Sequence, residues 1–285
     1  NVDEFAPRLS FFFNSHLDFF EEIAKFRAAR RIWAKHMKLK YGAKNDRSLK
    51  CRFHTQTAGC SLTAQQPEIN IARTSFQALA GVLGGTQSLH TNSMDETLAL
   101  PTEKAAEIAL RTQQLIAYET GVANVVDPLG GSWFIEHLTD EIEKDVEEYF
   151  EEINNLGGVI PAIEQGYFQR EIAKSASEYQ RKVDENKRIV VGVNKFVKEN
   201  EELDIPVLEI DPNAVNKQLE KLKILKKSRN NTAVSSSLKS IRRACKTNEN
   251  LMPVLISAAK SHVTLGEIIT EMKKEFGEWQ ENTGF

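Results

Sequence analysis

The sequence predicts an α/β protein in which a parallel sheet comes first and a mostly helical region follows. A short apolar run, a polar loop and an amphipathic helix succeed one another four times before residue 132, which is the order that a parallel sheet requires. After that residue the pattern is helical almost throughout. With 41% hydrophobic and 27% charged residues in 285, the chain has the balance of a globular protein and enough length for one large or two small domains.

Four segments carry the pattern of a strand. The expected strands are residues 8–13, 49–56, 85–90 and 122–126. The first is an apolar run bounded by Pro7 and Asn14, and the second alternates apolar with polar side chains. Both patterns are typical of strands that are buried on at least one face.

Helical periodicity lies between these strands and beyond them. The expected helices are residues 19–40, 67–83, 102–119, 139–155, 161–186 and 212–246. The first begins with acidic residues and has Gly42 just past its end, as helix termini prefer. Two short apolar runs, residues 188–193 and 206–210, read as strand-like interruptions of the helical region.

Polar side chains gather where the expected strands end. They are His54, Gln56, Gln87, Ser88, His90 and Asp127. The carboxyl ends of the strands form the face on which a (β/α)8 barrel carries its active site. Such a barrel needs eight strand–helix units, whereas four are visible here, so we expect a half barrel. Its two open edges would be covered by another chain, by a second copy or by a missing half.

Charge and cysteine content exclude several classes of protein. The net charge of −3 and a pI near 6.2 argue against a nucleic-acid binder or a membrane-surface protein. No apolar run approaches the ~20 residues of a membrane span. Neither a dinucleotide-binding fingerprint nor a P-loop occurs. The three cysteines form no CxxC pair, which disfavours disulfides and a zinc site and favours a reducing, cytoplasmic location.

Five motifs in order carry a resemblance to a known family. They are FFEEIAKFRAARR at 19–31, RFHTQTAG at 52–59, GTQSLHTNS at 85–93, DPLGGS at 127–132 and VGVNK at 191–195. Together they resemble the catalytic chain of the methylmalonyl-CoA mutase family. The resemblance implies an adenosylcobalamin-dependent acyl-CoA mutase that rearranges a carbon skeleton by a radical 1,2-shift. It also implies a TIM-type (β/α)8 barrel, with CoA threaded through its centre and cobalamin across its C-terminal face.

On this resemblance the chain supplies the last four strand–helix units of the barrel, residues 1–135, and a helical C-terminal region, residues 136–285. His54 is expected to hydrogen-bond the thioester carbonyl, as a donor that stabilises charge or spin on oxygen. Gln56 is expected between substrate and corrin. Glu96, with Ala99 close by, is expected to face the cobalamin and the ribose hydroxyls of its adenosyl group.

Contacts with CoA are implied for a further set of residues. These are Arg8, Ser10, Arg47, Gln87 and Ser88. Arginine and hydroxyl groups suit phosphates and amides. The sequence departs from the family at Arg47, where lysine is common, and at Cys60 and Leu129, where tryptophan is frequent. Arg47 keeps the positive charge that a phosphate needs but offers it in a different geometry.

The family's cobalt-ligating D-x-H-x-x-G motif does not occur in this sequence. We therefore expect a separate domain to ligate the cobalt, and we expect this chain to hold no metal and to be inactive alone. The expected partners are an acyl-CoA, an N-terminal half barrel and a cobalamin-binding chain or domain, in a homo- or hetero-oligomer without nucleic acid or membrane. A non-catalytic assembly subunit or an acyl-CoA-binding module remains the alternative.

Two of these features also have a simpler interpretation, and two cysteines near the expected site have no base that the sequence indicates. The polar residues at the strand ends could satisfy backbone groups in the loops that follow. The segment from Asp127 to Gly131 is interpreted equally well as a tight turn. Cys51 and Cys60 lie near the expected site, but a nucleophilic thiol needs a nearby base, and the sequence indicates none.

Overall fold

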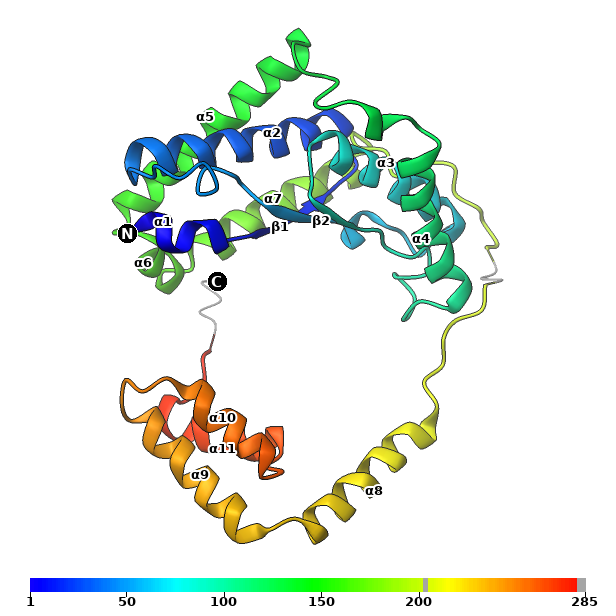
Figure 1. Cartoon of the computed structure of the whole chain (residues 1–285). Coiled ribbons are helices and arrows are strands. Elements are labelled where there is room, and N and C mark those ends of the chain that lie inside the picture. The colour runs from blue at the N-terminus through cyan, green and yellow to red at the C-terminus, as the bar shows by residue number, and fades with distance from the viewer. Residues whose placement is uncertain (202–204, 281–285) are drawn as a thin grey trace. The chain divides into compact units, whose positions relative to one another are not determined.

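The computed structural model describes residues 1–201 and 205–280. They form two compact units, of which the first ends at Leu208 and the second starts at Glu209 (Figure 1). Each unit has its own buried core. Among the described residues no helix is long and apolar enough to cross a lipid bilayer. The expected boundary at residue 135 concerns where a barrel ends, and it stays a prediction.

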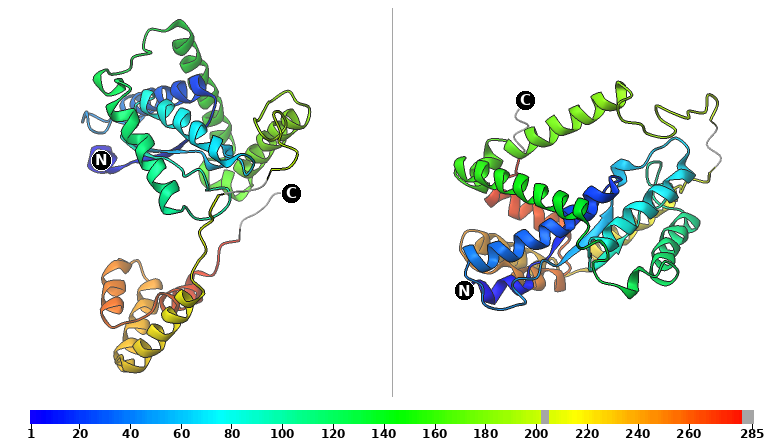
Figure 2. Two further views of the ribbon diagram at one scale, coloured as in Figure 1. Left: turned by 90° about the vertical axis from the view of Figure 1, so that its right-hand side faces the viewer. Right: turned by 90° about the horizontal axis from the view of Figure 1, so that it is seen from above.

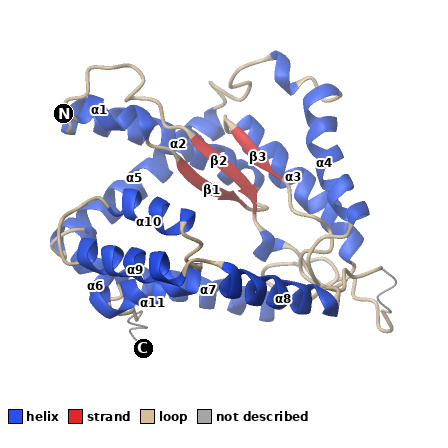
Figure 3. Cartoon of the chain, turned by 60° about the horizontal axis from the view of Figure 1, so that its bottom comes forward, coloured by secondary structure: helices blue, strands red, loops and turns tan. Residues whose placement is uncertain are grey.

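The first unit is built on a small parallel sheet. Its strands are β1 (Phe11–Ser15), β2 (Phe53–Thr57) and β3 (Ser88–His90), in the order β1-β2-β3, and they lie side by side (Figure 3). Helices α2 (Phe19–Lys35) and α3 (Asn70–Leu83) make the two crossovers. The predicted parallel α/β arrangement is therefore confirmed, whereas the described residues contain three paired strands and do not show a closed barrel.

One face of this sheet is packed against the crossover helices. The Phe26 ring of α2 is fully buried and stacks on Phe53, with the ring centroids 5.3 Å apart. Thr55 and Thr57 are also fully buried on this face. A β-carbon on Gly84 would lie 2.5 Å from the Phe26 ring, so only glycine lets the end of α3 approach α2 this closely. Phe53, Thr55 and Thr57 therefore face the helical layer.

The expected fourth strand at 122–126 is wrong. Residues Val122–Asn124 form a 3-10 turn instead, and Val126 is 96% exposed. Asp127 adopts a positive φ of 48° and pairs with Arg27 of α2, so this segment is held over the helical layer and away from the sheet. Tertiary pairing has overridden the β-propensity of the valines here.

The remaining helices of the first unit cover its outside. They are α1 (Val2–Phe5), α4 (Glu103–Tyr118), α5 (Trp133–Asn155), α6 (Val159–Glu164) and α7 (Tyr167–Asp184). Helix α4 packs on α3, and α5 runs alongside α2 (Figure 2). Helix α5 begins at Trp133 and not at residue 139, and α2 continues as a π-helical turn over His36–Lys40.

Two further expectations for this unit need correction. The helix expected at 161–186 is divided at Gly166, whose φ of +66° ends the helical path. The strand-like run at 188–193 forms only a single bridge between Val191 and Lys195. Residues 206–210 form no strand.

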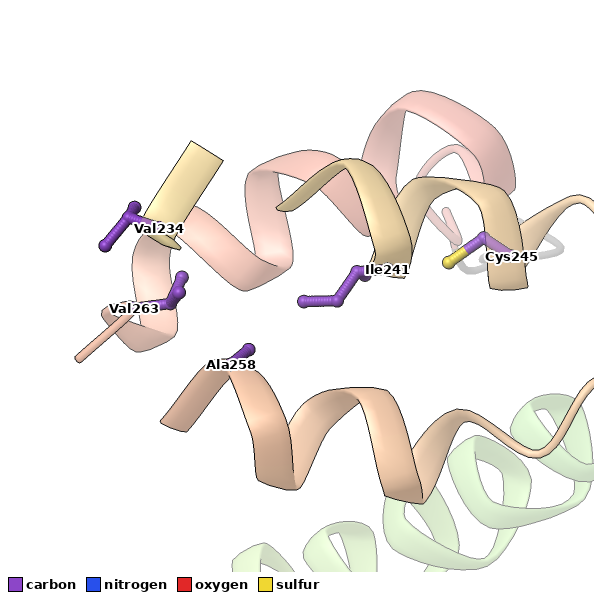
Figure 4. Close-up of a cluster of buried hydrophobic side chains, with 5 residues drawn as sticks. All are labelled: Val234, Ile241, Cys245, Ala258 and Val263. Carbon is purple, nitrogen blue, oxygen red and sulfur yellow. The ribbon is translucent and has the colours of Figure 1, made fainter. Parts of the chain in front are cut away.

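The second unit is a small helical fold. Its elements are α8 (Pro212–Ser228), α9 (Asn231–Cys245), α10 (Leu251–Lys260) and α11 (Leu265–Phe276). Its core gathers Val234, Ile241, Cys245, Ala258 and Val263 (Figure 4). The single helix expected at 212–246 is broken at Asn230, whose side chain caps α9. Arg229 forms a bidentate pair with Glu267, which also closes the capping box of α11.

Candidate functional site

The sheet face opposite α2 and α3 carries two rows of side chains that run across all three strands. The strand register aligns Phe12 of β1 with His54 of β2 and Ser88 of β3. The next row aligns Asn14, Gln56 and His90. Phe12 is 57% exposed, so this face is open. Because side chains alternate along a strand, the burial of Phe53, Thr55 and Thr57 fixes His54 and Gln56 on the open face.

His54 is oriented by the neighbouring strand. Its Nδ1 lies 2.7 Å from the Ser88 hydroxyl oxygen, and its ring lies 5.6 Å from the Phe12 ring, centroid to centroid. A serine hydroxyl that donates to Nδ1 selects the tautomer with the proton on Nε2. In that tautomer, Nε2 is the donor that the ring offers to a ligand. The structure brings together two of the predicted site residues, His54 and Ser88.

Gln56 leads to a tight group of polar atoms at the carboxyl edge. Its amide nitrogen donates to Asn92 Oδ1 over 3.1 Å, and the backbone nitrogen of Asn92 donates to Thr57 Oγ1 over 2.9 Å. Asn92 is 2% exposed, and its Nδ2 has no hydrogen-bond partner among the described residues. A β-carbon on Gly59 would lie 2.8 Å from Glu96 Oε1 and 3.1 Å from Asn92 Nδ2.

Sequence reasoning gave no role to Gly59 or Asn92, although both lie inside motifs that it singled out. A glycine directly after a strand is a usable signal, because it often marks a close approach of backbone and side chain. The partner of a buried asparagine, in contrast, depends on the register of the strands. The register is not visible in a single sequence.

Glu96 lies in the loop between β3 and α4. Partial desolvation in this loop raises the pKa of its carboxyl group, and nearby His90 acts in the opposite direction. The neighbouring Asp95 is buried and accepts hydrogen bonds from the backbone and hydroxyl of Thr102, the N-cap of α4. This anchor fixes the loop while the Glu96 side chain stays exposed, and Ala99 lies half-buried in the same loop.

Most of the residues expected to contact CoA lie at the amino ends of the strands, opposite the edge that carries Glu96. The exception is Ser88, which lies in the row with His54. Arg8 and Ser10 directly precede β1, and Arg47 lies in the turn that leads toward β2. All three side chains are exposed. The Asp3 carboxylate accepts from the backbone of Lys44 and from the Ser48 hydroxyl, so the chain start and this turn are held together.

Gln87 is placed differently from Ser88. Its Oε1 accepts from the backbone nitrogen of Phe53 over 2.6 Å, and its Nε2 donates to the Gly85 carbonyl over 2.7 Å. Both ends of the amide are therefore engaged by backbone in locking β3 to β2. The structure does not bring Gln87 into the row with His54, and its role toward CoA stays a prediction.

The segment from Asp127 to Gly131, called the clasp below, joins α2 to the start of α5 through hydrogen bonds to Arg27 and Glu136. The Asp127 carboxylate accepts from Arg27 Nε and Nη2 over 3.0 and 3.1 Å, and Glu136 Oε1 accepts from Arg27 and from the Gly131 backbone. The Arg27 guanidinium, followed by the Gly131 amide, lowers the pKa of Glu136 to about 2. Of its two interpretations, the turn is the one that these contacts favour.

Cys60 has a base in its neighbourhood that the sequence did not indicate. His16 follows β1, and its Nδ1 lies 4.0 Å from Cys60 Sγ and 3.0 Å from Ser61 Oγ. Burial lowers the pKa of His16, which keeps the ring neutral near pH 7. Among the described residues no group of three or more His, Cys, Asp or Glu side chains is placed to hold a metal ion.

Comparison with known proteins gives a consistent result over the chain. A family model described as methylmalonyl-CoA mutase matches residues 1–278. The chain is 46% identical over its whole length to the 2-hydroxyisobutanoyl-CoA mutase large subunit of Aquincola tertiaricarbonis, of which it covers 51%. It is 43% identical over 96% of its length to the methylmalonyl-CoA mutase of Escherichia coli and 42% identical over 99% to the mitochondrial enzyme of Homo sapiens, covering 38% of each. The chain thus spans about half or less of these relatives.

Proposed function

Because the chain belongs to the methylmalonyl-CoA mutase family, we propose that it supplies one side of the acyl-CoA site of an adenosylcobalamin-dependent mutase. The reaction is the radical 1,2 rearrangement of a carbon skeleton, with methylmalonyl-CoA and succinyl-CoA or a related acyl-CoA as substrate and product. The observation that carries this proposal is the row formed by Phe12, His54 and Ser88 on the open sheet face.

The order of groups along the strands fits an elongated thioester. Arg8, Ser10 and Arg47 lie toward the amino ends, where they would meet the phosphates and amides of CoA. His54 lies within the sheet, where Nε2 would donate to the thioester carbonyl and Ser88 would hold the ring in place. A fixed donor of this kind stabilises charge that develops on oxygen during the rearrangement. A five-residue strand spans about 17 Å, which leaves room for an extended acyl-pantetheine arm.

The carboxyl edge fits the adenosyl part of the cofactor. Gly59 leaves space beside Glu96, whose carboxylate is a suitable acceptor for ribose hydroxyls. Asn92 offers a buried amide nitrogen without a partner among the described residues, and Gln56 lies next to it. When bound, the cofactor would supply the radical that starts the rearrangement. The cobalt ligand would come from a separate domain, since the family's D-x-H-x-x-G motif does not occur in this sequence.

An N-terminal half barrel is the partner that the first unit favours. Within the described residues β1 and β3 each leave one edge unpaired. Beside β1 lies an apolar hollow of about 510 Å³ between α2 and α5. Its lining includes Phe11, Phe13, Ile32, Val146 and Phe150. A further parallel strand paired with the open edge of β1 would be connected to β1 by a right-handed helical crossover. The helix of that crossover would then lie in this hollow.

The test is turnover by the assembled enzyme. We expect no turnover by the chain alone. We expect turnover of methylmalonyl-CoA or 2-hydroxyisobutanoyl-CoA once an N-terminal half barrel, a cobalamin-binding domain and adenosylcobalamin are added. His54→Ala should lower kcat by about 100-fold or more, as loss of one such donor does. His137→Ala on α5, whose side chain is exposed, is the matched histidine control and should leave kcat unchanged.

Two results would contradict the proposal. Normal turnover by the chain alone would end the idea that it supplies only one side of the site. Unchanged turnover in the His54→Ala enzyme would favour the alternative, a non-catalytic assembly subunit that retains the fold. Titration of CoA and cobalamin in separate experiments distinguishes both from a simple acyl-CoA-binding module, which would respond to CoA alone.

A further inference from the structure

A second hollow in the first unit is rich in cationic side chains and has no assigned role. It has a volume of about 320 Å³ and lies between α2, the turn at Asp127 and the start of α5. Its lining consists of Arg27, Arg30, Arg31, Asp127, Glu136 and Thr139. Helix α2 covers the sheet face opposite His54, so this hollow belongs to the helical layer and not to the open face.

Two of the three arginines already have carboxylate partners. Arg27 binds Asp127 and Glu136, with Arg27 Nη2 2.7 Å from Glu136 Oε1. Arg31 binds Asp140, with Nη2 2.6 Å from Oδ1, and also pairs with Glu143. Each of these guanidinium groups thus has two carboxylates to compensate its charge.

Arg30 is the exception. No hydrogen bond or ion pair of Arg30 is found within residues 1–201 and 205–280, and its Nε is fully buried. A β-carbon on Gly85 would lie 3.1 Å from Arg30 Cζ, so the guanidinium packs closely against the start of the segment that leads into β3. Burial lowers the pKa of Arg30, although nearby Asp127 opposes that effect. Arg30 is half-buried, and a partly desolvated cation gains from a carboxylate that completes its hydrogen bonds.

We propose that this hollow binds a single carboxylate group through the guanidinium of Arg30. Arg27 and Arg31 are compensated by the carboxylates of Asp127, Glu136, Asp140 and Glu143, so the single positive charge of Arg30 is the one in the lining without a hydrogen-bonded partner among the described residues. A group with one negative charge balances it, whereas a phosphate dianion would face repulsion from Asp127 and Glu136. The planar fork of arginine matches a carboxylate in two parallel hydrogen bonds, and Arg30 is the arginine of the lining that has no carboxylate partner among the described residues.

The carboxylate has two conceivable sources with the same chemistry. One is a small organic acid free in solution, and the other is an aspartate or glutamate side chain from a neighbouring protein segment. The hollow has a volume of about 320 Å³, whereas one water molecule occupies about 30 Å³ in the liquid. A carboxylate group from either source therefore fits in it. The site does not depend on the reaction proposed above, since it lies in the helical layer.

The experiment uses sodium acetate as the probe and sodium chloride at equal ionic strength as the reference. Binding should shift the NMR signal of the Arg30 Nε–H group and raise the Tm of the chain. At ten times Kd the rise should be about 3–6 °C. Arg30→Met should abolish both effects, and Arg30→Lys should weaken binding about tenfold, because lysine lacks the fork. Arg111→Met, at an arginine of α4 that pairs with Glu107, should respond to acetate like the unmodified chain.

The outcomes test three things: the site itself, the charge of its ligand and the source of that ligand. An equal response to acetate and chloride, or a response that survives Arg30→Met, would refute the site. Tighter binding of inorganic phosphate than of acetate would refute the assignment to a single charge. The same titration in the assembled enzyme distinguishes the sources. A free acid still binds there, whereas a side chain from the added segment leaves the Arg30 Nε–H signal already shifted and insensitive to acetate.

Discussion

Replacing Phe26 by alanine tests which face of the sheet is the core, and the candidate site depends on that assignment. The Phe26 ring is fully buried, stacks on Phe53 and lies 6.1 Å from Phe13, centroid to centroid. Gly84 leaves no space between it and the end of α3. The ring therefore joins two strands and two helices, so its removal leaves a cavity that its neighbours cannot easily fill.

The expected loss is about 4 kcal/mol in the free energy of unfolding, within the range for buried phenylalanine truncations. In a unit of this size that lowers Tm by about 8–16 °C. Urea unfolding followed by tryptophan fluorescence measures the loss, because Trp33 lies in the same cluster, 4.8 Å from the Phe11 ring. The urea midpoint should fall while the m-value stays unchanged, since the same surface is exposed on unfolding.

Phe12→Ala is the matched control on the opposite face. Phe12 is 57% exposed and lies in the row with His54, so its truncation should cost less than about 1 kcal/mol. A cost for Phe12→Ala equal to that for Phe26→Ala would show that the face assigned as open is buried. In that case His54 and Ser88 could not receive a ligand, and the reasoning behind the site would fail.

Further predictions concern the clasp, the carboxyl edge and the second unit. A double-mutant cycle with Arg27→Met and Asp127→Asn should give a coupling energy of about 1–2 kcal/mol in urea unfolding, because Asp127 is only partly buried; additive effects would contradict the clasp. Gly59→Ala should displace the Glu96 carboxylate and raise the Kd of adenosylcobalamin in the assembled enzyme about tenfold; unchanged affinity would remove Glu96 from the cofactor site. Hydrogen bonds from Arg229 lower the pKa of Glu267 to about 2. The stabilisation of the second unit is therefore complete above about pH 4.5 and is lost as the pH falls toward 2. In Glu267→Gln, acid unfolding followed by circular dichroism should lose this component, and an unchanged pH profile would argue against the pair.

The sequence predicts the elements of the first unit well wherever periodicity and burial agree. In β2 the alternation of Phe53 and Thr55 with His54 and Gln56 already separates the two faces. It fails at residues 122–126, where the β-branched Val122, Val125 and Val126 suggest a strand. A salt bridge to α2, remote in sequence, determines the conformation there.

The breaks in the expected long helices have local causes that a periodicity argument passes over. Gly166 lies between two helical segments, α6 and α7, and its positive φ marks the break between them. Asn230 is an N-cap residue, which is a signal in itself, but the strong pattern on either side conceals it. In both cases the residue at the break, a glycine with positive φ or an asparagine that caps the next helix, accounts for the turn.

The candidate site can be predicted from the sequence only in part, because residue types are visible in a sequence and strand register is not. His54 and Gln56 are identified by their residue types and their position on a strand. Their partners Ser88 and Asn92 follow from the register between β2 and β3, which a single sequence does not contain. Gln87, one residue before Ser88, has the same residue chemistry as Gln56 but is engaged with backbone, and no pattern in the sequence separates the two.

The chemistry of the open face indicates what should cover it. Parallel sheets are normally buried on both faces, and the face beneath α2 carries the apolar cluster of Phe26, Cys51 and Phe53 together with the small threonines Thr55 and Thr57. On the open face the row of Asn14, Gln56 and His90 is polar throughout, and His54 beside it holds a hydrogen bond to Ser88. A second helical layer would leave these groups without acceptors and donors, at a cost of about 1–3 kcal/mol for each. A polar ligand enclosed by further strands would satisfy them, and this supports our proposal that the open face is the inner wall of a barrel that other strands complete.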